Sequence, residues 1–225
     1  RYGWYIIGVI SVACLPLSLW AAARLSVPAQ RNTAAGGIKL HLIWRELAGY
    51  IGFAMGYIVY LTFLSAWMTD QQAPALLISA VWIIMGVALI ASPFVWRGVL
   101  ARHASGKPLA MILTGIAIGS ALPLVLPAGG AVVISAVVFG LCVFMAPGAI
   151  TSFIRQNLPA ESWAAAMSLF TVVFAIAQTA GPFAAGALGD LTGNIGSSLL
   201  AAAAILLTGA AVVVFQKPLP QQDPG

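Results

Sequence analysis

Charged residues are scarce in this sequence. Lys, Arg, Asp and Glu together make up 7% of its 225 residues, whereas hydrophobic residues make up 61% and the mean hydropathy is +1.02. A water-soluble domain needs roughly a quarter of its residues charged to keep its surface hydrated. The shortage of charge therefore excludes an ordinary soluble domain and places most of the chain in the hydrocarbon of a membrane.

The apolar runs also lack the alternation of polar and apolar residues that is typical of membrane β-barrel strands. In hydrocarbon every backbone N–H and C=O group needs an internal partner, which only helices and closed barrels supply. We therefore predict an all-α integral membrane protein, a bundle of seven transmembrane helices. A span needs about 20 apolar residues. The segments that meet this requirement are Trp4–Ala23, Leu47–Trp67, Leu76–Trp96, Leu109–Leu126, Val132–Phe153, Trp163–Leu188 and Ser197–Phe215.

Ionisable residues are missing from the centres of these spans, where they would mark functional sites. Their absence excludes a retinal lysine, a relay of acids within these spans and a pair of histidine ligands, and no nucleophile–base pair lies at membrane depth. We expect no enzymatic activity, no cofactor, no metal and no nucleic-acid partner. Cys14 and Cys142 lie inside apolar runs, where we expect free thiols. We expect Glu46 and Arg45, at one end of the second span, to form a surface ion pair.

Basic residues predict the orientation of the spans. If the spans alternate in direction, nine of the ten Lys and Arg residues fall on one side: Arg24, Arg31, Lys39, Arg45, Arg97, Arg102, Lys107, Arg155 and Lys217. The other side has Arg1, with Asp70 and Asp190. Because basic residues concentrate in cytoplasmic loops, we predict that the N-terminus of the chain is outside and the C-terminus is in the cytoplasm.

The connections divide the chain into four parts. We predict a single helix over residues 1–23, a basic cytoplasmic linker over 24–46, a compact six-helix bundle over 47–215 and a cytoplasmic tail over 216–225. The linker is long and polar, as is typical of a boundary between units, whereas the remaining loops are short. Residues 38–44 fit a short amphipathic segment as well as ordinary linker.

Glycine and proline recur within the spans. The Gly52/Gly56 and Gly115/Gly119 pairs have the spacing of close helix contacts, so we expect them to serve packing. Prolines at positions 93, 123, 147 and 182 each remove a backbone hydrogen bond and permit a kink.

A polar stripe in the sixth predicted span carries the first candidate binding residues. Ser168, Thr171, Phe174 and Gln178 recur at three- and four-residue steps, which places them on one helix face. A glutamine amide is costly to expose to lipid, so Gln178 must meet another helix or a watery cavity. The sequence favours neither of these two alternatives.

Aromatic residues supply the other candidates. Tyr57 and Tyr60 share a face of the second span, and their hydroxyl groups need partners at membrane depth. Such a cluster either lines a substrate cavity or packs between helices. Trp82 in the third span is a candidate by the same reasoning.

Several segments carry a family resemblance. They are residues 158–161 (LPAE), 166–170 (AMSLF), 178–182 (QTAGP) and 190–193 (DLTG), together with 56–64 (GYIVYLTFL) and 92–96 (SPFVW). In these segments the chain resembles the major facilitator superfamily, and more narrowly its YbfB/YjiJ-type members. The resemblance covers nearly the whole chain, from a sixth helix through the twelfth.

The resemblance implies a secondary active transporter of a small organic solute that works by alternating access in a bacterial inner membrane. Residues 1–23 would then be the last helix of an N-terminal half. Five further helices are expected to precede Arg1, as the missing part of the same protein. Tyr57, Tyr60, Trp82, Thr171, Phe174 and Gln178 would be this half's contribution to the solute site. The expected partners are membrane lipids and the solute. The alternative is a seven-helix receptor or sensor, which the predicted topology also fits.

Overall fold

The computed structural model describes residues 2–24, 40–126 and 129–220. Within these ranges the regular structure is helical, with no strand, which confirms the predicted all-α class. The chain separates into two units, Arg1–Gly36 and Gly37–Gly225. The first unit contains helix α1 (Tyr2–Arg24), which covers the first predicted span. The Arg24 guanidinium of α1 lies 5.0 Å from the centre of the Trp20 ring.

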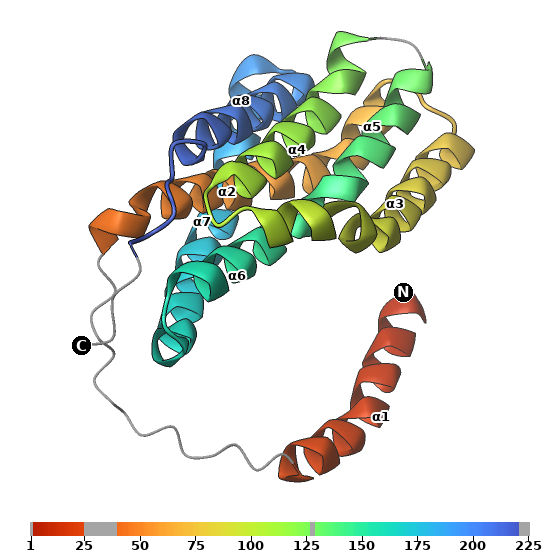
Figure 1. The fold of residues 1–225 in the computed structure, drawn as a ribbon. Coiled ribbons are helices and arrows are strands. Elements are labelled where there is room, and N and C mark those ends of the chain that lie inside the picture. Colours follow the sequence, from red (N-terminus) through yellow and green to blue (C-terminus); the bar gives the residue numbers. More distant parts are fainter. Residues whose placement is uncertain (1, 25–39, 127–128, 221–225) are drawn as a thin grey trace, which may run out of the picture. The chain divides into compact units, whose positions relative to one another are not determined.

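The second unit is a bundle of long helices (Figure 1). Among the described residues, six of its helical segments are long and apolar enough to cross a membrane, as predicted. Its helices are α2 (Leu40–Asp70), α3 (Ala75–Arg102), α4 (Lys107–Val125), α5 (Gly129–Val143), α6 (Met145–Asn157), α7 (Trp163–Thr192) and α8 (Ile195–Val213). A short 3₁₀ turn, Ala160–Ser162, leads into α7.

One predicted span is a broken helix. Helices α5 and α6 meet at Phe144, whose φ and ψ of −89° and 5° leave the α-helical region. Pro147 lies three residues further on, lacks an N–H group, and would clash with the carbonyl of Val143 in a regular helix. The prolines at positions 93, 123 and 182 lie inside helices that continue through them. Of the four predicted break points, only Pro147 therefore interrupts its helix.

The helices approach most closely where they carry small residues. Helix α2 packs against α8 and α7, α4 packs between α8 and α5, and α3 packs on α5. A methyl carbon added to Gly52 would lie 3.3 Å from Cα of Gly209 on α8. One added to Gly119 would lie 2.9 Å from the backbone nitrogen of Phe139 on α5. The predicted packing role of both glycine pairs is confirmed, because larger residues would force the helices apart.

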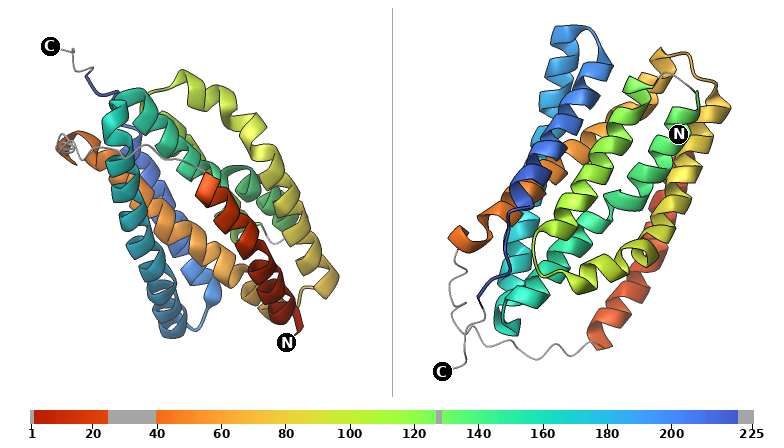
Figure 2. Two further views of the ribbon diagram at one scale, coloured as in Figure 1. Left: turned by 90° about the horizontal axis from the view of Figure 1, so that it is seen from below. Right: turned by 45° about the horizontal axis from the view of Figure 1, so that its top comes forward.

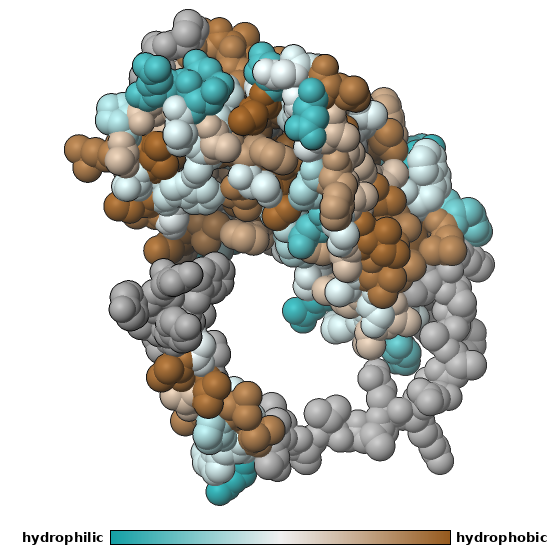
Figure 3. Space-filling view, turned by 180° about the vertical axis from the view of Figure 1, so that it is seen from behind, coloured by the Kyte–Doolittle hydropathy of each residue, from teal (hydrophilic) through white to brown (hydrophobic). Residues whose placement is uncertain are grey.

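Helices α3 and α7 are less buried than the other long helices of the second unit. In their most apolar stretches, 22% of the residues of α3 and of α7 are buried, compared with 56% in α2 and α4. Large apolar side chains such as Phe94 and Phe183 are exposed on them. The face in Figure 3 shows exposed hydrophobic residues between separate groups of hydrophilic ones. Such a surface needs lipid or another apolar surface against it.

The up-and-down path of the chain brings the basic residues of the second unit to one end of the bundle. This basic end contains the start of α2, the α3–α4 turn, the end of α6 and the segment after α8, all at the lower end of the right-hand view in Figure 2. Its basic side chains are Arg45, Arg97, Arg102, Lys107, Arg155 and Lys217. The opposite, acidic end contains Asp70 and Asp190 near the ends of α2 and α7.

The structure differs from the expectations at two helix ends. Helix α2 begins at Leu40, so residues 40–46 of the predicted linker are helical, because Ile43 is buried and anchors this turn in the bundle. Glu46 forms no surface ion pair: it is 1% exposed and its Oε2 has no hydrogen-bond partner within the described residues. Trp96, at the end of the predicted span Leu76–Trp96, is 9% exposed and its indole N–H donates to the Leu141 carbonyl, so it packs inside the bundle.

Cys14 and Cys142 are free thiols in the structure, Cys14 exposed in the first unit and Cys142 buried in the second.

Candidate functional site

Two predicted site residues meet near the middle of neighbouring helices. The Tyr57 hydroxyl of α2 donates a hydrogen bond of 2.5 Å to Oε1 of Gln178 on α7. Tyr57 is 6% exposed, whereas Gln178 is half-buried. The helices approach closely here because α7 has a glycine at position 181, where an added methyl carbon would lie 2.6 Å from the Met55 carbonyl oxygen. The structure thus gives Gln178 an interhelical partner.

The Tyr57–Gln178 pair leaves hydrogen-bonding capacity unused. A glutamine amide has two N–H donors and one carbonyl acceptor. Tyr57 occupies the acceptor, and within the described residues Nε2 of Gln178 makes no hydrogen bond. A half-buried amide with free donors can bind an oxygen or nitrogen acceptor on another molecule or on another part of the protein.

Aromatic rings surround this pair. Phe53 and Tyr57 stack with their centres 4.5 Å apart and an interplanar angle of 12°. Phe174, a predicted site residue on α7, stacks 5.4 Å from Tyr50, 5.9 Å from Phe53 and 6.0 Å from Tyr57. We call Tyr50, Phe53, Tyr57 and Phe174 the aromatic group. Its ring faces and edges suit contact with a flat apolar group.

Tyr60 lies apart from this group in its contacts. It is fully buried, its hydroxyl lies 2.5 Å from Oγ of Ser135 on α5, and its ring centre lies 4.2 Å from that of Phe139. Ser135 in turn donates to the Gly119 carbonyl on α4. These contacts place Tyr60 in the packing between α2, α5 and α4, so its role in solute binding stays a prediction.

Trp82 and Thr171 are exposed. The indole N–H of Trp82, on α3, donates to Oγ of Ser65 on α2, and 38% of the side chain is exposed. The Thr171 hydroxyl donates to the Met167 carbonyl one turn earlier in α7, so its hydrogen-bonding donor is already used. Neither contact joins these residues to the Tyr57–Gln178 pair.

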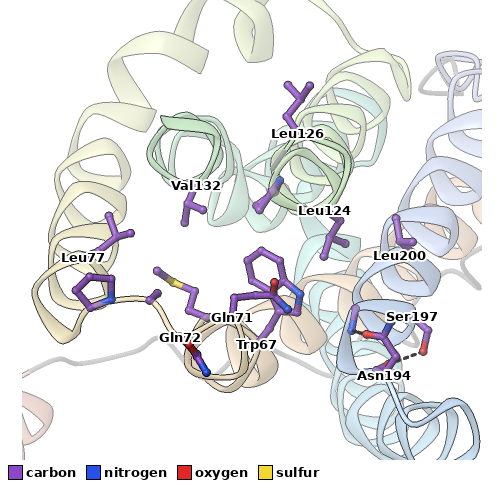
Figure 4. Close-up of a pocket in the computed structure, with 15 residues that line it drawn as sticks. Trp67, Gln71, Gln72, Leu77, Leu124, Leu126, Val132, Asn194, Ser197 and Leu200 are labelled. Atoms are coloured by element: carbon purple, nitrogen blue, oxygen red, sulfur yellow. Dashed lines mark hydrogen bonds between the residues drawn. The ribbon is translucent and has the colours of Figure 1, made fainter. Parts of the chain in front are cut away.

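A cavity of about 620 Å³ that was not predicted lies at the acidic end (Figure 4). The cavity is lined by Trp67 at the end of α2, Gln71 in the turn after it, Leu124 from α4, Asn194 in the α7–α8 turn and Ser197 in the first turn of α8. The Asn194 side chain caps α8 by accepting from the Gly196 backbone N–H at 2.8 Å. The polar turns at residues 71–72 and 193–194, both predicted on the same side of the membrane, were the signal available in the sequence.

Metal chemistry has no candidate among the described residues, because no group of three or more His, Cys, Asp or Glu side chains comes together there. The chemistry that this half of the bundle presents is instead hydrogen bonding and aromatic contact. A ligand is held by such groups without covalent change.

The long apolar helices, their exposed hydrophobic faces and the polar pair at mid-span define a multi-pass helical membrane protein. The sequence matches the family described as "Uncharacterised MFS-type transporter YbfB" over residues 1–214. The chain therefore belongs to this family of major facilitator superfamily transporters, as the sequence motifs predicted. No curated protein matches it.

Proposed function

We propose that this chain is the solute-binding C-terminal portion of a secondary active transporter that works by alternating access. Carriers of this architecture move two helical halves around a site near the bilayer midplane. The observation that supports this function best is the Tyr57–Gln178 pair, which joins α2 to α7 near the middle of both helices and leaves the two amide N–H donors of Gln178 without a partner in the described part of the chain.

The proposed solute is a small organic molecule with a flat apolar part and a hydrogen-bond acceptor. The aromatic group would stack on the apolar part, and Nε2 of Gln178 would donate to the acceptor. No Asp, Glu, Lys, Arg or His occurs between residues 71 and 96 or between 163 and 189, which include most of α3 and α7. A neutral lining of this kind favours an uncharged group at this part of the site.

The exposed apolar surfaces of α3 and α7 support this proposal. Their exposed faces would meet the N-terminal half of the carrier and line the path between the halves. We further propose that the basic end lies in the cytoplasm, with the N-terminus of the chain outside the inner membrane. The family match favours this carrier over the seven-helix receptor or sensor.

Transport by the complete protein in proteoliposomes tests the proposal. A panel of aromatic solutes with acceptor groups is screened with and without a proton gradient. For a transported solute, we expect Gln178→Ala to raise KM by about tenfold or more, the equivalent of losing one hydrogen bond of roughly 1.5 kcal/mol. Thr179→Ala is the matched control, because Thr179 is exposed on the next position of α7 and bonds only to the Ala175 carbonyl. Equal KM values for the two variants would remove Gln178 from the site.

A second test needs no known solute. Single cysteines replace Gln178 or Ile118 in a protein carrying Cys14→Ser and Cys142→Ala. Ile118 is 50% exposed on α4, the helix between α5 and α8, where we expect lipid. A membrane-impermeant maleimide should label the cysteine at position 178 and not the one at 118, because the reagent and the thiolate both need water. Failure to label position 178 from either side would contradict a watery path beside α7.

A further inference from the structure

A buried acid lies at the basic end, away from the Tyr57–Gln178 pair. Glu46 on α2 is 1% exposed, and Gln216, which follows α8, is 4% exposed. Both adjoin Gly106 at the start of α4: a methyl carbon added there would lie 2.9 Å from Oε2 of Glu46 and 2.7 Å from Cβ of Gln216. Figures 1 and 2 show the segment after α8 running beside the first turns of α2. Three helices therefore meet at these side chains.

The hydrogen bonds of Gln216 fix the direction of its amide. Its Nε2 donates to the Leu42 carbonyl on α2 at 2.9 Å and to the Lys217 carbonyl at 2.9 Å, which uses both N–H groups. Its backbone carbonyl accepts from the Gly106 N–H at 3.0 Å. Turning the amide over would break both Nε2 bonds, so Oε1 has to face inward as an acceptor.

Two buried oxygen atoms at this place have no partner. They are Oε2 of Glu46 and Oε1 of Gln216, and within the described residues no other buried side-chain nitrogen or oxygen lacks one. Two acceptors cannot bond to each other, and a buried acceptor without a donor is costly. A proton on Glu46 would turn one of these acceptors into an O–H donor for the other.

Within the described residues, no N–H or O–H group donates to Oε2 of Glu46. A helix N-terminus ordinarily stabilises a carboxylate through its free N–H groups. At the start of α4, however, the Gly106 N–H bonds to the Gln216 carbonyl, the Lys107 N–H bonds to Oγ of Ser105, Pro108 has no N–H, and the Leu109 N–H does not donate to Oε2 of Glu46. The charge of a bare carboxylate would therefore be poorly compensated there.

The ionisable side chains on the helices packed around this end lie elsewhere. The Arg45 guanidinium lies 5.1 Å from the centre of the Trp44 ring, and that of Arg155 on α6 lies 5.1 Å from the centre of the Trp163 ring. The other ionisable side chains of the described residues at this end are exposed: His41 on α2, Arg97 and Arg102 on α3, His103 in the α3–α4 turn, Lys107 on α4, Glu161 before α7 and Lys217 after α8.

We propose that Glu46 is a proton-binding site whose neutral carboxyl group donates to Oε1 of Gln216. The bound proton holds the start of α2, the start of α4 and the segment after α8 together at the basic end. Its release leaves a buried negative charge beside a second unpaired acceptor, so these helix ends separate more easily as the pH rises. The proposal depends on the packing of the bundle and not on the proposed solute.

Thermal unfolding of the full-length protein in detergent, measured across a pH series, tests this site. The stabilising proton is present at low pH and is lost as the pH rises. Over the pH range in which Glu46 titrates, the folding equilibrium constant should therefore fall by up to about tenfold per pH unit, the linkage expected for one proton. Glu46→Gln keeps a donor toward Gln216 and cannot ionise, so it should fold and lose this part of the pH dependence.

Glu161→Gln is the matched control, because Glu161 is the other glutamate at this end and is exposed. It should retain the wild-type pH dependence. Infrared difference spectra should show the band of a protonated carboxyl in the wild type and in Glu161→Gln, but not in Glu46→Gln. Identical pH profiles for wild type and Glu46→Gln would overturn the proposal. So would a carboxylate band for Glu46 together with stabilisation by added sodium or potassium at constant pH, which would indicate a metal cation at this place.

Discussion

Adding a single methyl group to α2 tests its close contact with α8. A methyl carbon added to Gly56 would lie 2.5 Å from Cγ of Leu206 and 3.0 Å from the Ala202 carbonyl oxygen. Carbon atoms in favourable contact are about 3.5–4.0 Å apart, so Leu206 or the whole of α8 has to move by about 1 Å. Leu206 is fully buried, and Cγ is not the free end of its side chain, so no simple rotation relieves the overlap.

The expected cost of Gly56→Ala follows from two opposing terms. Overpacking a well-filled contact costs about 1–3 kcal/mol. Alanine in place of glycine inside a helix returns about 0.5–1 kcal/mol. Gly86→Ala on α3 is the matched control, because nothing lies within 4 Å of the added carbon and only the favourable term remains. The two variants should therefore differ in unfolding free energy by about 1–3 kcal/mol, with Gly56→Ala the less stable.

Thermal unfolding of the purified protein in detergent measures this difference. For a chain of this size, each kcal/mol corresponds to a shift in melting temperature of roughly 2–4 °C. The double variant Gly56→Ala/Leu206→Ala should lose less unfolding free energy than the two single variants lose together, because removing the leucine side chain makes room for the new methyl group. Equal melting temperatures for Gly56→Ala and Gly86→Ala would refute the close α2–α8 contact.

Two further variants test buried hydrogen bonds in the same unfolding assay. Tyr60→Phe should lower the unfolding free energy by about 1 kcal/mol, because Oγ of Ser135 loses its tyrosine partner. Unfolding equal to that of the wild type would contradict the buried Tyr60–Ser135 hydrogen bond. Trp96→Phe should destabilise by about 1–3 kcal/mol, since it removes the N–H that satisfies the Leu141 carbonyl and leaves space in the core. Unfolding unchanged from wild type would contradict a buried Trp96.

The helical class and the spans of the second unit could be predicted from the sequence because they depend on local composition. Hydrocarbon requires helices, and each long apolar run is one helix or, in one case, a broken helix. The packing role of Gly52 and Gly56 was also predictable, because three- and four-residue spacing alone places them on one face.

The positions and partners of individual polar and aromatic side chains were harder to predict. Glu46 looked like a surface residue because Arg45 precedes it, yet the fold turns the two in different directions, Arg45 toward Trp44 and Glu46 into the bundle. The Tyr57–Gln178 bond joins residues 121 positions apart, and only the tertiary packing brings them together. For the same reason, the sequence left open whether Gln178 makes a packing contact or forms part of a ligand site.

The break at Phe144 shows the limit of proline as a signal. Five prolines occur inside predicted spans, and among the described residues only Pro147 accompanies an interrupted helix. Neighbouring helices can satisfy the backbone groups that a proline frees, so the outcome depends on surroundings that the sequence does not specify.

The central claim is that the second unit crosses a membrane with its basic end in the cytoplasm. In a protein lacking Cys14 and Cys142, single cysteines at Ser105, beside Lys107, and at the exposed Gln71, beside Asp70, are labelled with an impermeant maleimide in intact cells and in inside-out vesicles. Labelling of position 71 in cells only and of position 105 in inside-out vesicles only is the predicted result. Labelling of both positions from the same side would contradict the topology, and with it the assignment of this chain as a carrier.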